Sequence, residues 1–63
     1  MKNLLKESRK EKGISQEDLA RISGVSRTVI SYIETGKDVN VKLSTLTSLS
    51  KALDKKVSEI FLT

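Results

Sequence analysis

Residues 27–35 place a row of hydrogen-bonding side chains along one face of an expected helix. Each residue of a helix advances by about 100° around the axis, so Ile30 and Ile33 fall about 60° apart and define a buried side. The opposite arc, about 140° wide, carries four polar side chains: Arg27, Thr28, Ser31 and Tyr32. This face offers a guanidinium group, two aliphatic hydroxyls and a phenol for hydrogen bonding.

Arg27 lies in the first turn of the expected helix, where Asp or Glu would stabilise the helix more. A cation in the first turn opposes the helix dipole by roughly 0.3–1 kcal/mol, so its presence suggests a use. A guanidinium fork matches O6 and N7 of guanine, and hydroxyls such as those of Thr28 and Ser31 can donate or accept at either kind of base. An apolar group such as Val29 can meet a thymine methyl, and Tyr32 could stack on the sugar backbone or reach a phosphate.

A structural interpretation competes with this one. Any surface helix has a polar face, which accounts for Thr28 and Ser31 when each is taken singly. The Tyr32 ring could fold over the surface of the helix with only its hydroxyl in water. Arg27 is the residue that the structural interpretation explains least.

Helices earlier in the chain must position this face. Gly13 is placed to end a helix over residues 2–12 in a left-handed conformation. Ser15 has the character of an N-cap and is followed three residues later by Asp18, which predicts a capping box and a helix over Gln16–Ser23.

The link from this helix to the next is short. Gly24 supplies a positive φ, and Ser26 is a second N-cap, so only about three residues separate the two helices. That is too few for parallel packing, and the helix over 27–35 must cross the preceding one steeply. The pattern predicts a helix-turn-helix arrangement in outline.

The composition excludes most catalytic chemistry. The 63 residues include 12 Lys or Arg, 8 Asp or Glu and no Cys, His or Pro, with a formal net charge of +4 and 37% apolar residues. Without Cys or His there is no disulfide, no thiolate or imidazole metal site and no His-based acid–base scheme, so we expect no enzyme, no metal and no cofactor. The net charge suits a polyanionic partner but is common among soluble domains.

Length and hydropathy predict one small domain over residues 1–63. The longest apolar run, Ile60-Phe61-Leu62, is far shorter than the roughly 20 residues of a membrane span. The first residues lack the apolar stretch of a signal peptide. We therefore expect a cytoplasmic protein with no membrane partner and no evident small-molecule ligand.

The run from Gly13 to Gly36 resembles the Xre and Cro/lambda-repressor family of helix-turn-helix domains. The likeness rests on Ser-Gln-x-x-Leu-Ala at 15–20, Gly-Val-Ser at 24–26 and Ile-x-x-Ile-Glu-x-Gly at 30–36, at their mutual spacings. It extends over almost the whole chain. It implies an all-α, compact five-helix fold like that of lambda repressor, with the helix-turn-helix at helices 2 and 3 and helix 3 in the DNA major groove.

By position, the resemblance also assigns roles to individual residues. Those expected to read bases or to lie beside the base readers are Arg27, Thr28, Val29, Ser31 and Tyr32. Those expected to contact phosphates are Ser15, Gln16, Lys37 and Asn40. In relatives an Arg near the end of helix 1 pairs with the Glu that closes helix 3, which implies an ion pair between Arg9 and Glu34 that orients helix 3.

The chain departs from the family pattern around the fourth helix. Many members open this helix with Pro-Ser, where Val41-Lys42 stands here, so the usual cap is missing and the start of the helix is left open, as early as Asn40. Asp54 replaces the common Gly at its end, and because Asp tolerates the left-handed region less well, that turn could differ. Leucines still repeat at helical spacing: Leu43, Leu46, Leu49 and Leu53.

The last expected helix, residues 57–62, ends in three consecutive large apolar residues. One such helix cannot bury all three against a single core, so we expect Phe61 inside and Ile60 or Leu62 exposed. In relatives the surface around helix 5 often forms a two-fold dimer contact, which makes Ile60 and Leu62 candidates for a dimer interface. The alternative is a frayed terminus. Ile22, outward on the second helix, is another candidate for an exposed apolar residue.

The resemblance thus predicts a sequence-specific regulator of double-stranded DNA, a repressor that binds a palindromic operator as a homodimer. A phage switch, a restriction-modification controller or a chromosomal regulator would fit. An antitoxin-type module, which binds a protein partner and uses DNA mainly for autoregulation, is an alternative. A basic architectural binder without sequence preference is another.

Overall fold

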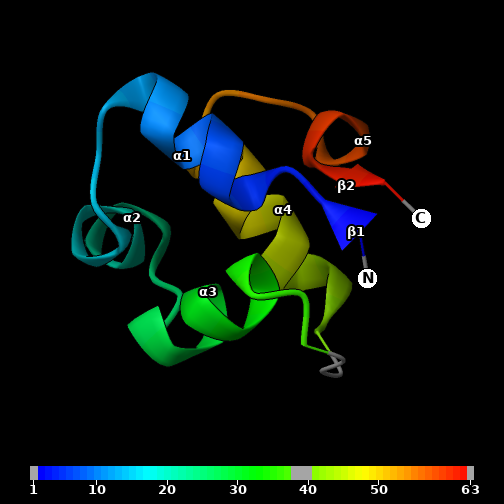
Figure 1. The fold of residues 1–63 in the computed structure, drawn as a ribbon, viewed down its shortest axis with the longest axis horizontal. Coiled ribbons are helices and arrows are strands. Elements are labelled where there is room, and N and C mark those ends of the chain that lie inside the picture. Colours follow the sequence, from blue (N-terminus) through cyan, green and yellow to red (C-terminus); the bar gives the residue numbers. More distant parts are fainter. Residues whose placement is uncertain (1, 38–40, 63) are drawn as a thin grey trace.

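Five helices and two short strands make up the described structure, a computed structural model that covers residues 2–37 and 41–62 (Figure 1). In chain order the elements are β1 (Lys2–Asn3), α1 (Leu5–Lys12), α2 (Gln16–Ser23), α3 (Arg27–Glu34), α4 (Leu43–Ala52), α5 (Val57–Ile60) and β2 (Phe61–Leu62). The predicted all-α, five-helix fold is confirmed, and the strands are an addition that the sequence did not predict. Within these described ranges, no helix is long and apolar enough to cross a membrane.

The core lies where the five helices meet. In Figure 1, α2 and α3 lie on one side of the molecule, and α5 lies on the other side with the two chain ends. Because short helices are marginal by themselves, this shared core is what holds α2 and α3 at their crossing angle. Its buried apolar residues come from every helix and from β2: Leu5, Leu19, Ile30, Ile33, Leu49, Leu53, Ile60 and Phe61.

The turn between α2 and α3 forms as its capping residues predict. Ser15 Oγ accepts a hydrogen bond from Asp18 N (3.0 Å), and Asp18 Oδ2 accepts one from Ser15 N (3.1 Å), which completes the capping box. Gly24 ends α2 in the left-handed region at φ 77°, and Ser26 Oγ caps α3 by accepting from Val29 N (3.2 Å). The predicted helix-turn-helix is therefore present.

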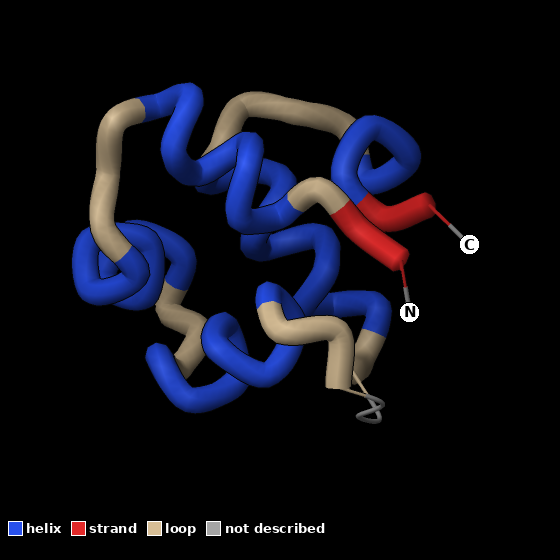
Figure 2. Tube along the Cα trace, in the orientation of Figure 1, coloured by secondary structure: helices blue, strands red, loops and turns tan. Residues whose placement is uncertain are grey.

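The two ends of the chain pair as antiparallel strands, which corrects the helical prediction for the N-terminus (Figure 2). The helix expected over residues 2–12 begins at Leu5, and Asn3 lies opposite Phe61 in the strand pair. The Asn3 side chain supplies the physical reason. Its Oδ1 accepts from Leu5 N (3.0 Å) at the start of α1, while its Nδ2 donates to Ile33 O (3.0 Å) near the end of α3.

The last predicted helix stops at Ile60, which corrects a candidate for the dimer interface. Phe61 is buried, as predicted, but Ile60 is fully buried as well and offers no exposed surface. The change from helix to extended backbone at Phe61 (φ −104°, ψ 99°) lets both side chains enter the core. The side chain of Leu62, the other candidate, lies outside the described part of the structure. Ile22 is 49% exposed, as expected.

The start of α4 is later than the earliest position considered. Asn40 itself lies outside the described residues, but the helix begins at Leu43, after an extended Lys42 (ψ 148°). In the part of the chain that the structure describes, Lys42 makes no side-chain cap hydrogen bond, so the predicted lack of a cap is confirmed. Leu43 is 70% exposed, and the leucine repeat reaches the core only from Leu46 onward.

The helices α1 and α4 end in the same hydrogen-bonded turn. At the end of α4, Asp54 N donates to Lys51 O (3.1 Å) and Lys55 N donates to Ser50 O (2.9 Å), the two bonds of a Schellman motif. Asp54 occupies the left-handed position at φ 57°, which Gly13 occupies at φ 76° after α1. The turn at Asp54 thus has the backbone conformation that glycine adopts most easily, and the Cβ of Asp54 strains the backbone there.

Asp54→Gly is expected to stabilise the protein by about 0.5–1 kcal/mol. The substitution removes the Cβ from a backbone at φ 57° and keeps both turn hydrogen bonds, which are made by the main chain. The midpoint of urea unfolding measures the gain. Gly13→Ala is the matched control and should lose about 1 kcal/mol. An unchanged or lower midpoint for Asp54→Gly would contradict the strain argument.

Candidate nucleic-acid interface

The polar face of α3 lies opposite the core and is hollowed. Arg27, Thr28 and Tyr32 are exposed and Ser31 is half-buried, while both isoleucines of the helix are buried. The four polar side chains line an open hollow of about 330 Å³ together with Gln16 of α2. The helix-turn-helix therefore brings hydrogen-bonding groups from two helices to one concave surface.

Val29 lies at the border of this face and has a different environment. Its side chain is half-buried and packs against the core. Its backbone N–H is held by the Ser26 cap (3.2 Å). Val29 therefore has less side chain available to a partner than the four polar residues beside it.

A buried ion pair connects the end of α3 to α1. Arg9 Nε donates to Glu34 Oε2 (2.7 Å) and Arg9 Nη2 donates to Glu34 Oε1 (3.0 Å), so that the guanidinium grips the carboxylate with two parallel bonds. Only 11% of the Arg9 side chain and 3% of the Glu34 side chain are exposed. The structure thus contains the pair that the resemblance implies, in an environment where breaking it is costly.

The same carboxylate is also bonded from α2. Gln16 Nε2 donates to Glu34 Oε1 (3.1 Å), and Arg9 Nη1 donates to Ile14 O (2.9 Å) in the turn before α2. Burial raises the pKa of Glu34, but the hydrogen bonds from Arg9 and Gln16 and the charge of Arg9 together bring that pKa below its ordinary value. The hydrogen bond to Glu34 outweighs burial and raises the pKa of Arg9. Both groups are charged at neutral pH, and α1, α2 and α3 meet at one carboxylate.

The N-terminus of α2 carries Ser15 and Gln16, both expected to contact phosphates. Each already makes a side-chain hydrogen bond inside the protein, Ser15 in the capping box and Gln16 to Glu34. Hydrogen bonds from the Ser15 backbone and from Arg21 lower the pKa of Asp18, so the first turn carries a fixed negative charge. Among the residues that the structure describes, no cluster of acidic, His or Cys side chains could hold a metal ion.

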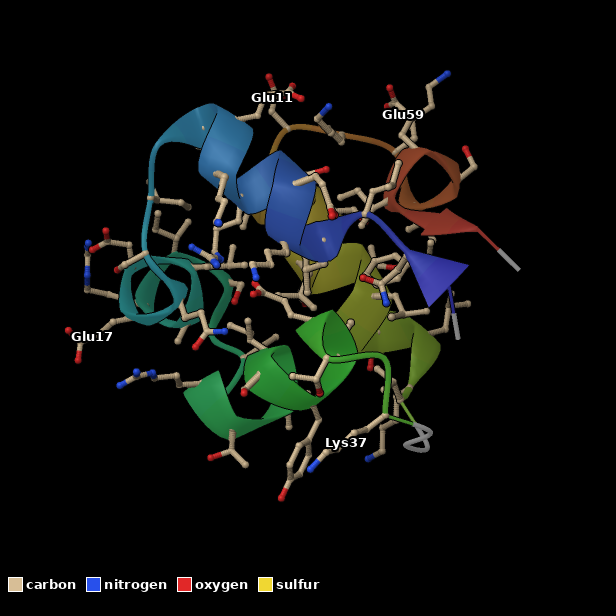
Figure 3. The ribbon with its side chains drawn as sticks, viewed as in Figure 1. Glu11, Glu17, Lys37 and Glu59 are labelled. Carbon is tan, nitrogen blue, oxygen red and sulfur yellow. The ribbon has the colours of Figure 1, made fainter. Side chains whose placement is uncertain are left out.

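Lys37, also expected to contact a phosphate, is exposed just beyond α3. Its Nζ lies 5.2 Å from the centroid of the Tyr32 ring, a cation–π arrangement. Figure 3 shows Lys37 on the outer side of α3, turned away from α1. Asn40, the last of the predicted phosphate contacts, lies outside the described residues.

Two contacts of this interface were not predicted from the sequence. No local signal links Gln16 to Glu34, because their partnership spans 18 residues and depends on how α2 crosses α3. The contact of Lys37 with Tyr32 did have a signal. Lys37 directly follows Gly36, and in a Schellman turn the residue after the glycine packs against the residue five positions earlier.

A comparison with known protein families identifies the family of the chain. A sequence model of the helix-turn-helix family matches residues 5–60. The chain belongs to the Xre/Cro-type helix-turn-helix family. This family is one of DNA-binding regulators.

Relatives of the helix-turn-helix protein include controller proteins. Control protein C.SmaI of Serratia marcescens is 51% identical over 47 residues, which make up 75% of this chain but 55% of that protein. An uncharacterised HTH-type transcriptional regulator of Methanocaldococcus jannaschii is 43% identical over 63 residues, 98% of this chain and 92% of that one. The crystal structure of the restriction-modification controller protein C.AhdI from Aeromonas hydrophila is similar with a TM-score of 0.82 and 42% identity, over 90% of this chain and 85% of that chain.

Removing one member of the Arg9–Glu34 pair is expected to cost about 3–5 kcal/mol of unfolding free energy at pH 7, because it leaves a buried charge unpaired. Arg9→Met combined with Glu34→Met should cost less than Arg9→Met alone, and urea unfolding measures both.

The fold lowers the pKa of Glu34, so this carboxylate stabilises the protein above its unfolded pKa of about 4.3 and loses that effect as the pH falls further. The difference in unfolding free energy between Arg9→Met and the double variant should therefore shrink towards pH 3.

The control for this experiment is Lys55→Ala, which breaks the ion pair with Glu11 (3.3 Å), where 29% of the Lys55 side chain and 71% of the Glu11 side chain are exposed. It should cost at most about 1 kcal/mol. A double variant Arg9→Met/Glu34→Met that costs as much as Arg9→Met alone, or more, at pH 7 would contradict a buried, coupled pair.

Proposed function

We propose that the protein is a sequence-specific repressor that binds a palindromic DNA operator as a homodimer, with α3 of each copy in a major groove. The observation that carries the proposal is the concave face on which Arg27, Thr28, Ser31 and Tyr32 of α3 meet Gln16 of α2. A guanidinium, hydroxyls and an amide on one surface can bond base edges and phosphates together, which a polar face made only for solvation does not require.

The proposal divides the interface into parts with different tasks. The base-reading group comprises Arg27, Thr28, Ser31 and Tyr32, with Val29 at its border. The phosphate-binding group comprises Ser15, Gln16, Lys37 and Asn40. The Arg9–Glu34 pair contacts no DNA in this scheme and orients α3 from behind, because it joins the end of α3 to α1.

The size of the molecule is compatible with two copies on one operator. Half-sites that lie one turn of DNA apart require about 34 Å between the two recognition helices. The described fold measures 24 × 21 × 19 Å, so two copies side by side can present their α3 helices at that separation. Promoter occupancy by such a dimer would be the means of repression.

The known relatives favour one setting for this regulator. Two similar proteins bear the names of a control protein and a restriction-modification controller protein. We therefore place this chain with the controllers of restriction-modification systems rather than with phage switches. Such a regulator acts where the DNA is, which assigns it to the cytoplasm.

Arg27→Ala is expected to weaken binding to the operator by about 1–3 kcal/mol and to leave binding to an unrelated duplex nearly unchanged. The operator is first isolated by enriching fragments of the source genome, including the DNA upstream of the gene itself, on the purified protein at near-physiological salt. Fluorescence anisotropy of labelled duplexes then gives both affinities. Lys37→Ala is the matched control and should weaken binding to both duplexes alike.

Two results would overturn the proposal, and they point to different alternatives. An equal loss on both duplexes for Arg27→Ala would identify a basic architectural binder. Failure to enrich any DNA would favour an antitoxin-type module, whose partner is a protein.

A further inference from the structure

The turn after α3 directs a lysine onto a tyrosine of the DNA-facing helix. Gly36 N donates to Ile33 O (3.1 Å) and Lys37 N donates to Tyr32 O (3.1 Å), the two bonds of a Schellman motif, with Gly36 left-handed at φ 75°. In this motif the residue after the glycine packs against the residue five positions before it. The backbone therefore fixes which side chain Lys37 meets.

The contact itself is unusual for its place in the turn. An apolar side chain commonly makes this contact, whereas here the Lys37 ammonium lies 5.2 Å from the centroid of the Tyr32 ring. Thr35 Oγ1 donates to Tyr32 O (3.0 Å) and fastens the same point of the main chain. A charged group is thus held at the edge of the hollow that Tyr32 lines.

Both side chains are exposed, and Tyr32 is 42% exposed, so their contact buries little surface. Its position is informative instead. Tyr32 belongs to the polar face of α3, and Lys37, in the turn just after α3, lies on the outer side of that helix (Figure 3). The Lys37 ammonium therefore lies on the same side of the molecule as the polar face of α3.

We propose that Tyr32 is a positioning residue, whose ring holds the Lys37 ammonium in place for one phosphate of the DNA backbone beside the bases that α3 reads. The inference rests on the proposed function. A lysine side chain that is free in solution loses rotamer freedom when it binds, and a ring that restricts it beforehand lowers this loss. The ring acts through its face, so the phenol hydroxyl is not needed for this task.

Salt dependence of DNA binding separates this role from a purely structural one. Each neutralised phosphate contributes about 0.9 to the slope of log K against log salt. Lys37→Ala should lower the slope by about that amount, and Tyr32→Leu should lower it similarly although it leaves the lysine in place. Tyr32→Phe, which keeps the ring, should retain the wild-type slope. A Tyr32→Leu/Lys37→Ala double variant should match Lys37→Ala alone.

The titrations use fluorescence anisotropy with the operator duplex and a mixed-sequence duplex, at a temperature where circular dichroism shows every variant folded. Lys56→Ala is the charge-matched control, because it removes a cation next to α5, across the molecule from α3, and should leave the slope unchanged (Figure 1). An unchanged slope for Tyr32→Leu, beside a lowered slope for Lys37→Ala, would overturn the inference and leave the proposed function intact. So would an unchanged slope for Lys37→Ala. A wild-type protein that binds neither duplex would instead overturn the proposed function.

Discussion

Two opposite charges lie buried between α1 and α3, and their burial constrains the helices around them. Removing Arg9 and Glu34 from water costs several kcal/mol for each ion unless partners and hydrogen bonds replace the lost hydration. The pair meets this condition through two parallel bonds and a further bond from Gln16. A domain of this length has a total stability of about 3–9 kcal/mol, so separating the two charges would cost a comparable amount. α3 therefore cannot turn away from α1 while the protein stays folded.

The two ends of α3 differ in how firmly the rest of the protein holds them. Its C-terminal end is bonded from three elements, by Arg9 of α1, by Gln16 of α2 and by Asn3 of β1, which donates to Ile33 O. Its N-terminal end carries the exposed Arg27 and opens into the hollow. In helix-turn-helix proteins the N-terminal residues of the recognition helix contact base edges. The arrangement thus fixes one end of α3 in the protein, and under the proposed function the other end contacts the DNA bases.

The sequence predicted the features whose causes are local. Ser15 and Ser26 mark helix starts because a hydroxyl caps the N–H three residues on, and this geometry needs no tertiary contact. The spacing of Ile30 and Ile33 likewise identified the buried side of α3, and with it the polar face.

The features that could not be predicted from the sequence depend on partners distant in the chain. Asn3 bonds a carbonyl 30 residues away and draws the N-terminus out of the predicted helix into a strand. A helical period through residue 62 made Ile60 one of two candidates for exposure, whereas the change to extended backbone at Phe61 buries the side chains of both Ile60 and Phe61. For Gln16 the sequence predicted a phosphate contact or simple capping of α2, but not its bond to Glu34, which exists only once α2 and α3 have packed.

The ratio of operator to mixed-sequence affinity in Glu34→Gln shows whether the Arg9–Glu34 pair orients α3 for DNA. The measurement is made at a temperature where the variant is folded, with Ala52→Gly in α4 as a control that lowers stability by about 1 kcal/mol through helix propensity. Glu34→Gln should lower this ratio by about tenfold or more, because base contacts depend on the orientation of the helix more than phosphate contacts do. Ala52→Gly should keep the wild-type ratio. A Glu34→Gln protein that is less stable yet keeps the wild-type ratio would show that the pair supports the fold without orienting α3 for DNA.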